Sequence, residues 1–149
     1  MRRAGLAVTI AAVVVAIAGC GHEEAMGQDR HNFGEPGLVR SVVPGVTFYP
    51  ACGNEVLVID GVSWYQYDPS NIDDFPDPQQ SIQTWIGSGG GVGMPATALT
   101  VVPRVVPPSP GDDVGILVVY GGNIAYWQSD SDVLATWLTA HPITYNWVC

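Results

Sequence analysis

Residues 55–66 constrain the fold most, because they contain the signature of a tight β-hairpin. Two runs rich in β-branched and aromatic residues, 55–59 and 62–66, flank the pair Asp60-Gly61. Such a pair between two strand-forming runs is typical of a two-residue type I′ turn, since both central residues of that turn have positive φ. We therefore expect an antiparallel hairpin at this position.

A second arrangement of the same kind follows at residues 116–128, where Gly121-Gly122-Asn123 separates two strand-forming runs. Each hairpin is followed by a Thr-Trp-aliphatic triplet, at residues 84–86 and 136–138. The gap to the triplet differs by about ten residues, so this is not a clean repeat. Two interpretations stay open: a duplicated hairpin-plus-helix unit, or two hairpins that use the same residue types independently.

The remaining segments predict further short strands and one or two short helices. Residues 42–49 and 97–106 are strongly β-branched but contain prolines. The first segment is therefore expected to form an edge strand, and the second either an edge strand or a polyproline-like extension. Residues 79–86 place three apolar side chains on one helical face. Ser131 can cap a second helix that carries Val133, Leu134, Trp137 and Leu138, and residues 143–149 are expected to form a final strand.

The N-terminus has the organisation of a secretory signal. The basic pair Arg2-Arg3 precedes an apolar run over residues 6–17, and small residues follow. A helix of that length spans roughly 18 Å, which is too short to cross a hydrocarbon core of about 30 Å. We therefore expect a processed signal rather than a membrane-spanning anchor.

The end of that run, Ile17-Ala18-Gly19-Cys20, resembles the lipobox of bacterial lipoproteins. The resemblance implies that a lipid is attached to Cys20, that residues 1–19 are removed, and that the protein is anchored to the membrane on its extracytoplasmic side. Residues 20–37 are polar and are expected to form a flexible tether. Residues 38–149 are then long enough for a single β-rich domain.

The charge of the predicted mature chain excludes one class of partner. It keeps three arginines against 14 acidic residues, a net charge of −11, and the sequence contains no lysine. So acidic a protein is repelled by nucleic acid, which we do not expect as a partner. A nucleotide is not expected either. The glycine-rich stretch 91–96 follows a segment expected to be helical and precedes one expected to be a strand, whereas a dinucleotide fingerprint needs a strand before it and a helix after it.

With Cys20 assigned to the lipid, Cys52 and Cys149 remain as a pair in a compartment where disulfides persist. Their disulfide would close a loop of about 97 residues and stabilise the domain by roughly 4–5 kcal/mol. The sequence thus predicts a mainly β fold: a small, disulfide-closed antiparallel β domain of about six to eight strands with two hairpins and one or two short helices. An α+β sheet with helices on one face is the alternative.

Candidate site residues fall into three groups. The aromatic pairs Trp64-Tyr65 and Tyr126-Trp127 place one ring on each side of the sheet, so one side is core and the other is either covered or exposed to a ligand. The loop containing Asp68, Asp73, Asp74 and Asp77 offers oxygen ligands for a weak Ca²⁺ site, and no other cofactor is expected. His141 is the one histidine of the expected domain and the candidate residue for catalysis.

No catalytic constellation is assembled by these spacings. We therefore expect a membrane-tethered, non-catalytic binding or structural module of the bacterial cell envelope, with a partner protein or an envelope glycan as its ligand. The alternative is a small envelope hydrolase that uses aspartate carboxylates or His141.

Overall fold

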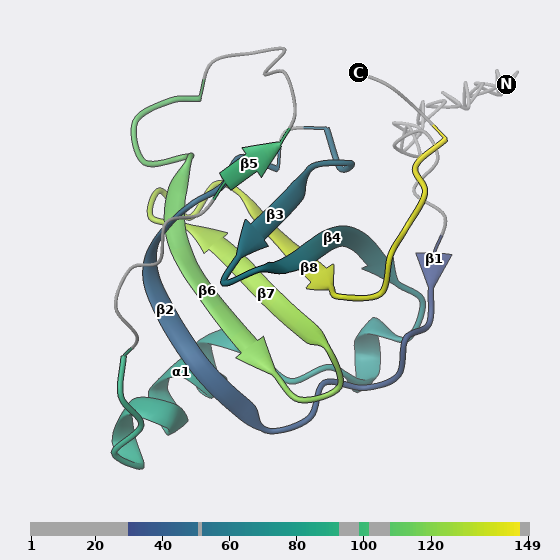
Figure 1. Ribbon diagram of the computed structural model, residues 1–149. Coiled ribbons are helices and arrows are strands. Elements are labelled where there is room, and N and C mark those ends of the chain that lie inside the picture. The colour runs from purple at the N-terminus through teal and green to yellow at the C-terminus, as the bar shows by residue number, and fades with distance from the viewer. Residues whose placement is uncertain (1–29, 51, 93–98, 102–107, 147–149) are drawn as a thin grey trace, which may run out of the picture.

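The computed structural model describes residues 30–50, 52–92, 99–101 and 108–146, and its fold is mainly β, as predicted (Figure 1). Seven strands are hydrogen-bonded in the order β2-β6-β7-β8-β4-β3-β5. Their bounds are β2 (Val39–Thr47), β3 (Val56–Ile59), β4 (Val62–Pro69), β5 (Leu99–Val101), β6 (Val114–Tyr120), β7 (Ile124–Ser129) and β8 (Ala135–Thr139). The described part of the chain also holds one α-helix, α1 (Pro78–Gly87), one 3-10 turn, η1 (Ile72–Asp74), and the short strand β1 (Arg30–His31).

Both predicted hairpins are confirmed. In β3–β4 the last pair before the turn is Ile59 opposite Val62, and the turn residues Asp60 and Gly61 have φ of 50° and 78°. In β6–β7 the connection is residues 121–123, of which Gly122 and Asn123 have φ of 81° and 61°. Asp and Asn tolerate this region better than other residues with a side chain, which explains their place in the turns.

The helix predicted after Ser131 is wrong, because residues 135–139 form strand β8. Asp132 has a φ of 59°, which no α-helix accommodates, and β8 fills the gap between β7 and β4 with antiparallel pairing on both sides. The hairpin-plus-helix duplication is therefore also wrong: Trp85 lies in α1, whereas Trp137 lies in β8.

The edge positions of the proline-containing strands are confirmed. Strand β2 lies at one end of the sheet order and β5 at the other. Pro44 and Gly45 fall where the register between β2 and β6 shifts, and such an irregularity is where a strand tolerates proline. Residues 143–146 form no strand, and residues 102–107 and 147–149 lie outside the described residues.

The sheet curls around its main core, with β3 and β4 crossing in front of β6 and β7 (Figure 1). The core combines Phe48 with buried side chains from six strands: Val46, Leu57, Ile59, Trp64, Leu117, Ala125, Trp127 and Leu138. Trp127 is fully buried; its ring packs edge-on to Phe48 with 5.5 Å between ring centroids. Its indole N–H also donates a hydrogen bond of 3.2 Å to the Val46 carbonyl, so the buried polar atom of the ring has a partner.

The opposite face of β2, β6, β7 and β8 carries a second, smaller apolar cluster beneath α1. Val42, Val118 and Tyr120 are buried there, with Ile82 and Trp85 of α1 packed against them. Asp77 caps the N-terminus of α1, because its carboxylate accepts hydrogen bonds from the backbone N–H of Gln79 at 2.8 Å and of Gln80 at 3.4 Å. Among the described residues no helix has the length and apolar character needed to cross a membrane.

The expected flexible tether is wrong for residues 30–37, which fold onto the domain. Strand β1 pairs in parallel with the end of β4, and Arg30 forms an ion pair of 2.8 Å with Asp68. The Phe33 ring is stacked between His31 and His141, at centroid distances of 5.4 and 5.0 Å, and contacts Tyr67 edge-on. A single apolar residue in a polar stretch thus anchors the segment. Residues 20–29 of the expected tether lie outside the described residues, so the expectation for them stays a prediction.

Candidate functional site

The predicted aromatic ligand site is wrong for two of its four residues. Trp64 and Trp127 are 6% and 0% exposed and belong to the main core, so neither ring reaches the surface. Tyr65 and Tyr126 are half-buried and point to the other face of the sheet, as alternation in a strand requires. Of the four, Tyr126 lies in a pocket.

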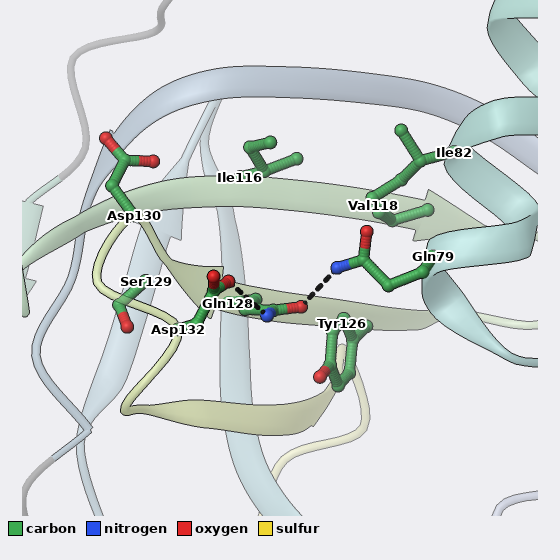
Figure 2. A pocket seen from close by; sticks show the side chains of 9 residues that line it. All are labelled: Gln79, Ile82, Ile116, Val118, Tyr126, Gln128, Ser129, Asp130 and Asp132. Atoms are coloured by element: carbon green, nitrogen blue, oxygen red, sulfur yellow. Dashed lines mark hydrogen bonds between the residues drawn. The ribbon is translucent and has the colours of Figure 1, made fainter.

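The pocket at Tyr126, which we call the Gln128 pocket, has a volume of about 190 Å³ and lies between the start of α1 and the outer face of β6 and β7 (Figure 2). The register of the hairpin builds its floor, because Ile116 is opposite Gln128 and Val118 is opposite Tyr126. Gln79 and Ile82 of α1 form one wall, and Ser129, Asp130 and Asp132 complete the lining.

A chain of hydrogen bonds fixes the polar groups of the Gln128 pocket (Figure 2). The Gln79 amide donates to the Gln128 side-chain oxygen at 2.6 Å, and the Gln128 amide donates to an Asp132 carboxylate oxygen at 2.7 Å. Asp132 thereby orients Gln128, which in turn orients Gln79. Each of the two side-chain amides has further donor and acceptor positions that these hydrogen bonds do not use. Gln79 and Gln128 can therefore offer both a donor and an acceptor to a ligand.

Tyr126 supplies an aromatic wall that is held in place. Its ring lies 5.0 Å from the Trp137 ring, and Trp137 in turn is packed edge-on against Phe75, with a centroid distance of 4.7 Å. Burial raises the pKa of Tyr126, and the negative charges of Asp77 and Asp132 raise it further. The hydroxyl is therefore protonated at neutral pH and is available as a donor.

A larger pocket, about 470 Å³ in volume, lies on the other side of α1. We call it the Tyr120 pocket; its mostly apolar lining comes from the segment before β2, from the loop before α1 and from α1 itself. Trp85, Leu38, Val39 and Pro76 contribute apolar walls, and Tyr120 lines it from β6. Burial raises the pKa of Tyr120, so this hydroxyl is also protonated at neutral pH.

The four aspartates predicted as Ca²⁺ ligands have separate roles. Asp68 pairs with Arg30, Asp77 caps α1, and Asp73 and Asp74 are exposed residues of η1. Within the residues that the structure describes, no three His, Cys, Asp or Glu side chains are grouped to hold a metal ion. The arrangement therefore lends no support to the Ca²⁺ prediction.

His141 stacks on Phe33 and lines neither pocket described above. Its observed contact is with the segment that joins the N-terminal region to the domain. Cys52 lies just before β3, and its backbone N–H donates to the Glu55 carboxylate at 2.8 Å. Its predicted partner Cys149 and the predicted lipidation site Cys20 lie outside the described residues, so both assignments stay predictions.

The sequence reasoning missed Gln79 and Gln128, the two polar residues at the centre of the Gln128 pocket. Period-two alternation over residues 116–128 places Ile116, Val118, Tyr126 and Gln128 on one face, and this signal was available. Gln79 could not be found in this way, because it lies 49 residues from Gln128 along the chain.

Comparison of the chain with models of protein families, with characterised proteins and with solved structures gives no match. The geometry of the two pockets is therefore the guide to function.

Proposed function

We propose that the protein is a membrane-tethered, non-catalytic binding module of the bacterial cell envelope, and that its Gln128 pocket takes a neutral, hydroxyl-rich group such as one sugar residue of an envelope glycan. The observation that carries this proposal is the hydrogen-bonded chain from Gln79 through Gln128 to Asp132 beside the ring of Tyr126. Fixed amide and carboxylate groups suit hydroxyls, and an aromatic wall suits the apolar face of a sugar ring.

Size and charge narrow the class of ligand. At about 190 Å³ the Gln128 pocket is smaller than the roughly 300–1,000 Å³ of pockets that enclose drug-sized molecules, so it suits a single ring or a terminal group. Its charged lining residues are the carboxylates Asp130 and Asp132. A neutral ligand avoids the repulsion that an anionic ligand would meet there.

The decisive experiment measures binding of neutral oligosaccharides of glucose and of N-acetylglucosamine to the full chain by calorimetry or NMR. Gln79→Ala is expected to weaken binding about tenfold, because it removes a ligand contact and one of the two hydrogen bonds made by the Gln128 side chain. The matched control is Gln83→Ala, an exposed glutamine of the same helix that does not line the pocket. Equal affinities for the two variants would contradict the proposal.

A hydrolase is the second candidate, because Asp130 and Asp132 line the same pocket and a pair of carboxylates is the machinery of glycoside hydrolysis. The same oligosaccharides separate the two functions. Chromatography of the incubated sugars should show intact starting material for a binding module, whereas shortened products that disappear with Asp130→Asn would establish catalysis.

The membrane tether and the closing disulfide belong to the same proposal. Lipid on Cys20 would hold the domain at the membrane surface, and replacement Cys20→Ser is expected to release the protein into the soluble fraction. A Cys52–Cys149 disulfide would fasten the end of the chain to the start of β3. Mass spectrometry after alkylation without reduction should leave both cysteines unmodified, and two alkylated cysteines would overturn the pairing.

A further inference from the structure

The apolar walls of the Tyr120 pocket form a surface that the domain itself leaves open. Leu38, at its rim, is 89% exposed, and Trp85 of α1 is half-buried beside it. Leu38, Val39, Pro76 and Trp85 line one pocket together, and contiguous apolar surface, unlike a single exposed residue, marks a contact surface. The volume, about 470 Å³, falls within the range of pockets that accept a bulky ligand group.

The hydroxyl of Tyr120 provides an independent sign of a ligand. The residue is 2% exposed, and its oxygen is buried without a hydrogen-bond partner in the described part of the chain. Ser81 is close enough to lower the pKa of Tyr120, but its hydroxyl donates to the Asp77 carbonyl at 2.9 Å and its oxygen makes no hydrogen bond of acceptable distance and angle with the Tyr120 hydroxyl. A buried donor without an acceptor costs free energy, and a ligand carbonyl in this pocket would remove that cost.

Among the described residues, carboxylates outnumber the one arginine close to the Tyr120 pocket, Arg40, whose guanidinium lies beside Gly121 and near the lining residue Gly37. Asp77 is its charged lining residue, and the exposed Asp73 and Asp74 lie in η1, which ends two residues before the wall residue Pro76. No arginine lines the pocket. A cationic ligand group would be attracted to this rim, and an anionic one repelled.

We propose that the Tyr120 pocket is a docking site for a basic peptide segment of a partner protein, with one bulky apolar side chain in the pocket, a backbone carbonyl on the Tyr120 hydroxyl and a flanking cation near Asp77. Such a segment supplies the apolar side chain, the hydrogen-bond acceptor and the positive charge that the pocket favours. The site is separate from the Gln128 pocket, since the two share no lining residue, and it goes beyond the proposed glycan-binding function.

The test uses the full chain labelled with ¹⁵N-tryptophan and the probe acetyl-Lys-Phe-Lys-amide. The indole N–H of Trp85, which donates to the Gly91 carbonyl at 3.0 Å, reports on the pocket and is assigned by its loss in Trp85→Phe. The probe is expected to shift this signal, whereas acetyl-Glu-Phe-Glu-amide and acetyl-Lys-Ser-Lys-amide should bind at least about tenfold more weakly. Equal shifts with all three peptides, or no shift with the first, would overturn the proposal.

Tyr120→Phe separates ligand recognition from stability. Because the hydroxyl is unpartnered, its removal should leave the urea midpoint of the free protein unchanged or raise it, while binding of the basic probe weakens about three- to tenfold. Tyr65→Phe, on another strand, is the matched control and should bind the probe as the natural chain does. Unaltered affinity in Tyr120→Phe would refute the role of the hydroxyl and with it the proposed site.

Two further titrations test whether the Tyr120 pocket binds a different class of ligand. A larger shift of the Trp85 signal by octyl glucoside than by the basic peptide would assign the pocket to a lipid-like chain and contradict the proposal. Neutral oligosaccharides should leave the Trp85 signal in place; if they move it, the pocket is part of a glycan site. Gln79→Ala is expected to leave peptide binding unchanged, so the two proposals fail independently.

Discussion

Truncation of Phe33 tests how the N-terminal segment is held to the domain. Residues 30–37 carry an exposed ion pair, the two-residue strand β1 and the Phe33 ring. Exposed ion pairs contribute little, about 0–1 kcal/mol, so the ring is expected to be the main attachment. Phe33→Ala removes its contacts with His31, Tyr67 and His141 in one step.

The size of the effect follows from these contacts. Aromatic pairs are worth about 0.5–1.5 kcal/mol each beyond the area that they bury. Phe33 is half-buried and its three contacts are not additive, so we expect a loss of about 2 kcal/mol in the free energy that holds the segment. This corresponds to an increase of about 30-fold in the population of the detached segment.

Hydrogen exchange measures this opening at one amide. The Ser70 N–H donates to the His31 carbonyl at 3.0 Å, so its protection depends on the attached segment. Phe33→Ala should lower the protection of Ser70 about 30-fold and leave the amides of the β6–β7 ladder unchanged. Val133→Ala, at a residue that is 72% exposed, is the control and should alter neither. If Ser70 and the ladder lose protection equally, or Ser70 loses none, the reasoning is refuted.

Two further predictions concern the sheet and its tyrosines. Gly115→Ala would place a Cβ against the Gln128 carbonyl group, 2.7 Å from the carbonyl carbon. This variant should lower the free energy of unfolding, measured in urea, by at least about 2 kcal/mol. The control Gly91→Ala places its Cβ more than 4 Å from any atom and should change the free energy of unfolding by less than about 0.5 kcal/mol. Equal urea midpoints for the two variants would contradict this. Burial raises the pKa of Tyr67 and Tyr145 well above 10.0, so these groups ionise first in the unfolded chain. Their contribution to stability is fully present below pH 10 and should fall as the pH rises above 10. Urea titrations at pH 8, 10 and 11 check this on the scale of unfolding free energy, and a flat profile would refute it.

The parts of the fold that could be predicted from sequence are those encoded by neighbouring residues. Asp60-Gly61 and residues 121–123 fix their turns through positive φ, and proline places β2 and β5 at the sheet edges. The class of the fold follows from these elements. No partner from elsewhere in the chain is needed to infer them.

The prediction failed where distant pairing decides the structure. Residues 133–138 have apolar positions compatible with a helix, but β4 and β7 leave a space that only another strand can fill, and tertiary pairing overrides local preference. Phe33 is a second case, since a lone aromatic residue in a polar stretch does not indicate that its ring will pack against His141 and Tyr67.

The candidate site was predicted in part for the same reason. Tyr126 was identified as an aromatic residue of a hairpin, and its face of the sheet follows from alternation. Which face is core could not be decided locally, so Trp64 and Trp127 were grouped with it. The two pockets exist because α1 lies across the outer face of the sheet, and no local pattern specifies that position.

The strand order has a consequence for when the domain can fold. The Trp127 indole hydrogen-bonds to the carbonyl of Val46, 81 residues away, and the Tyr145 hydroxyl bonds to that of Gln66, 79 residues away. Strand β2 pairs with β6, and β4 pairs with β8, so the sheet cannot close until segments far apart in the sequence have met. Folding is therefore expected to be slow and to require the C-terminal part of the chain. For a protein proposed to function outside the cytoplasm, this delay would keep the chain unfolded and threadable during export, and would postpone the assembly of both pockets until translocation is nearly complete.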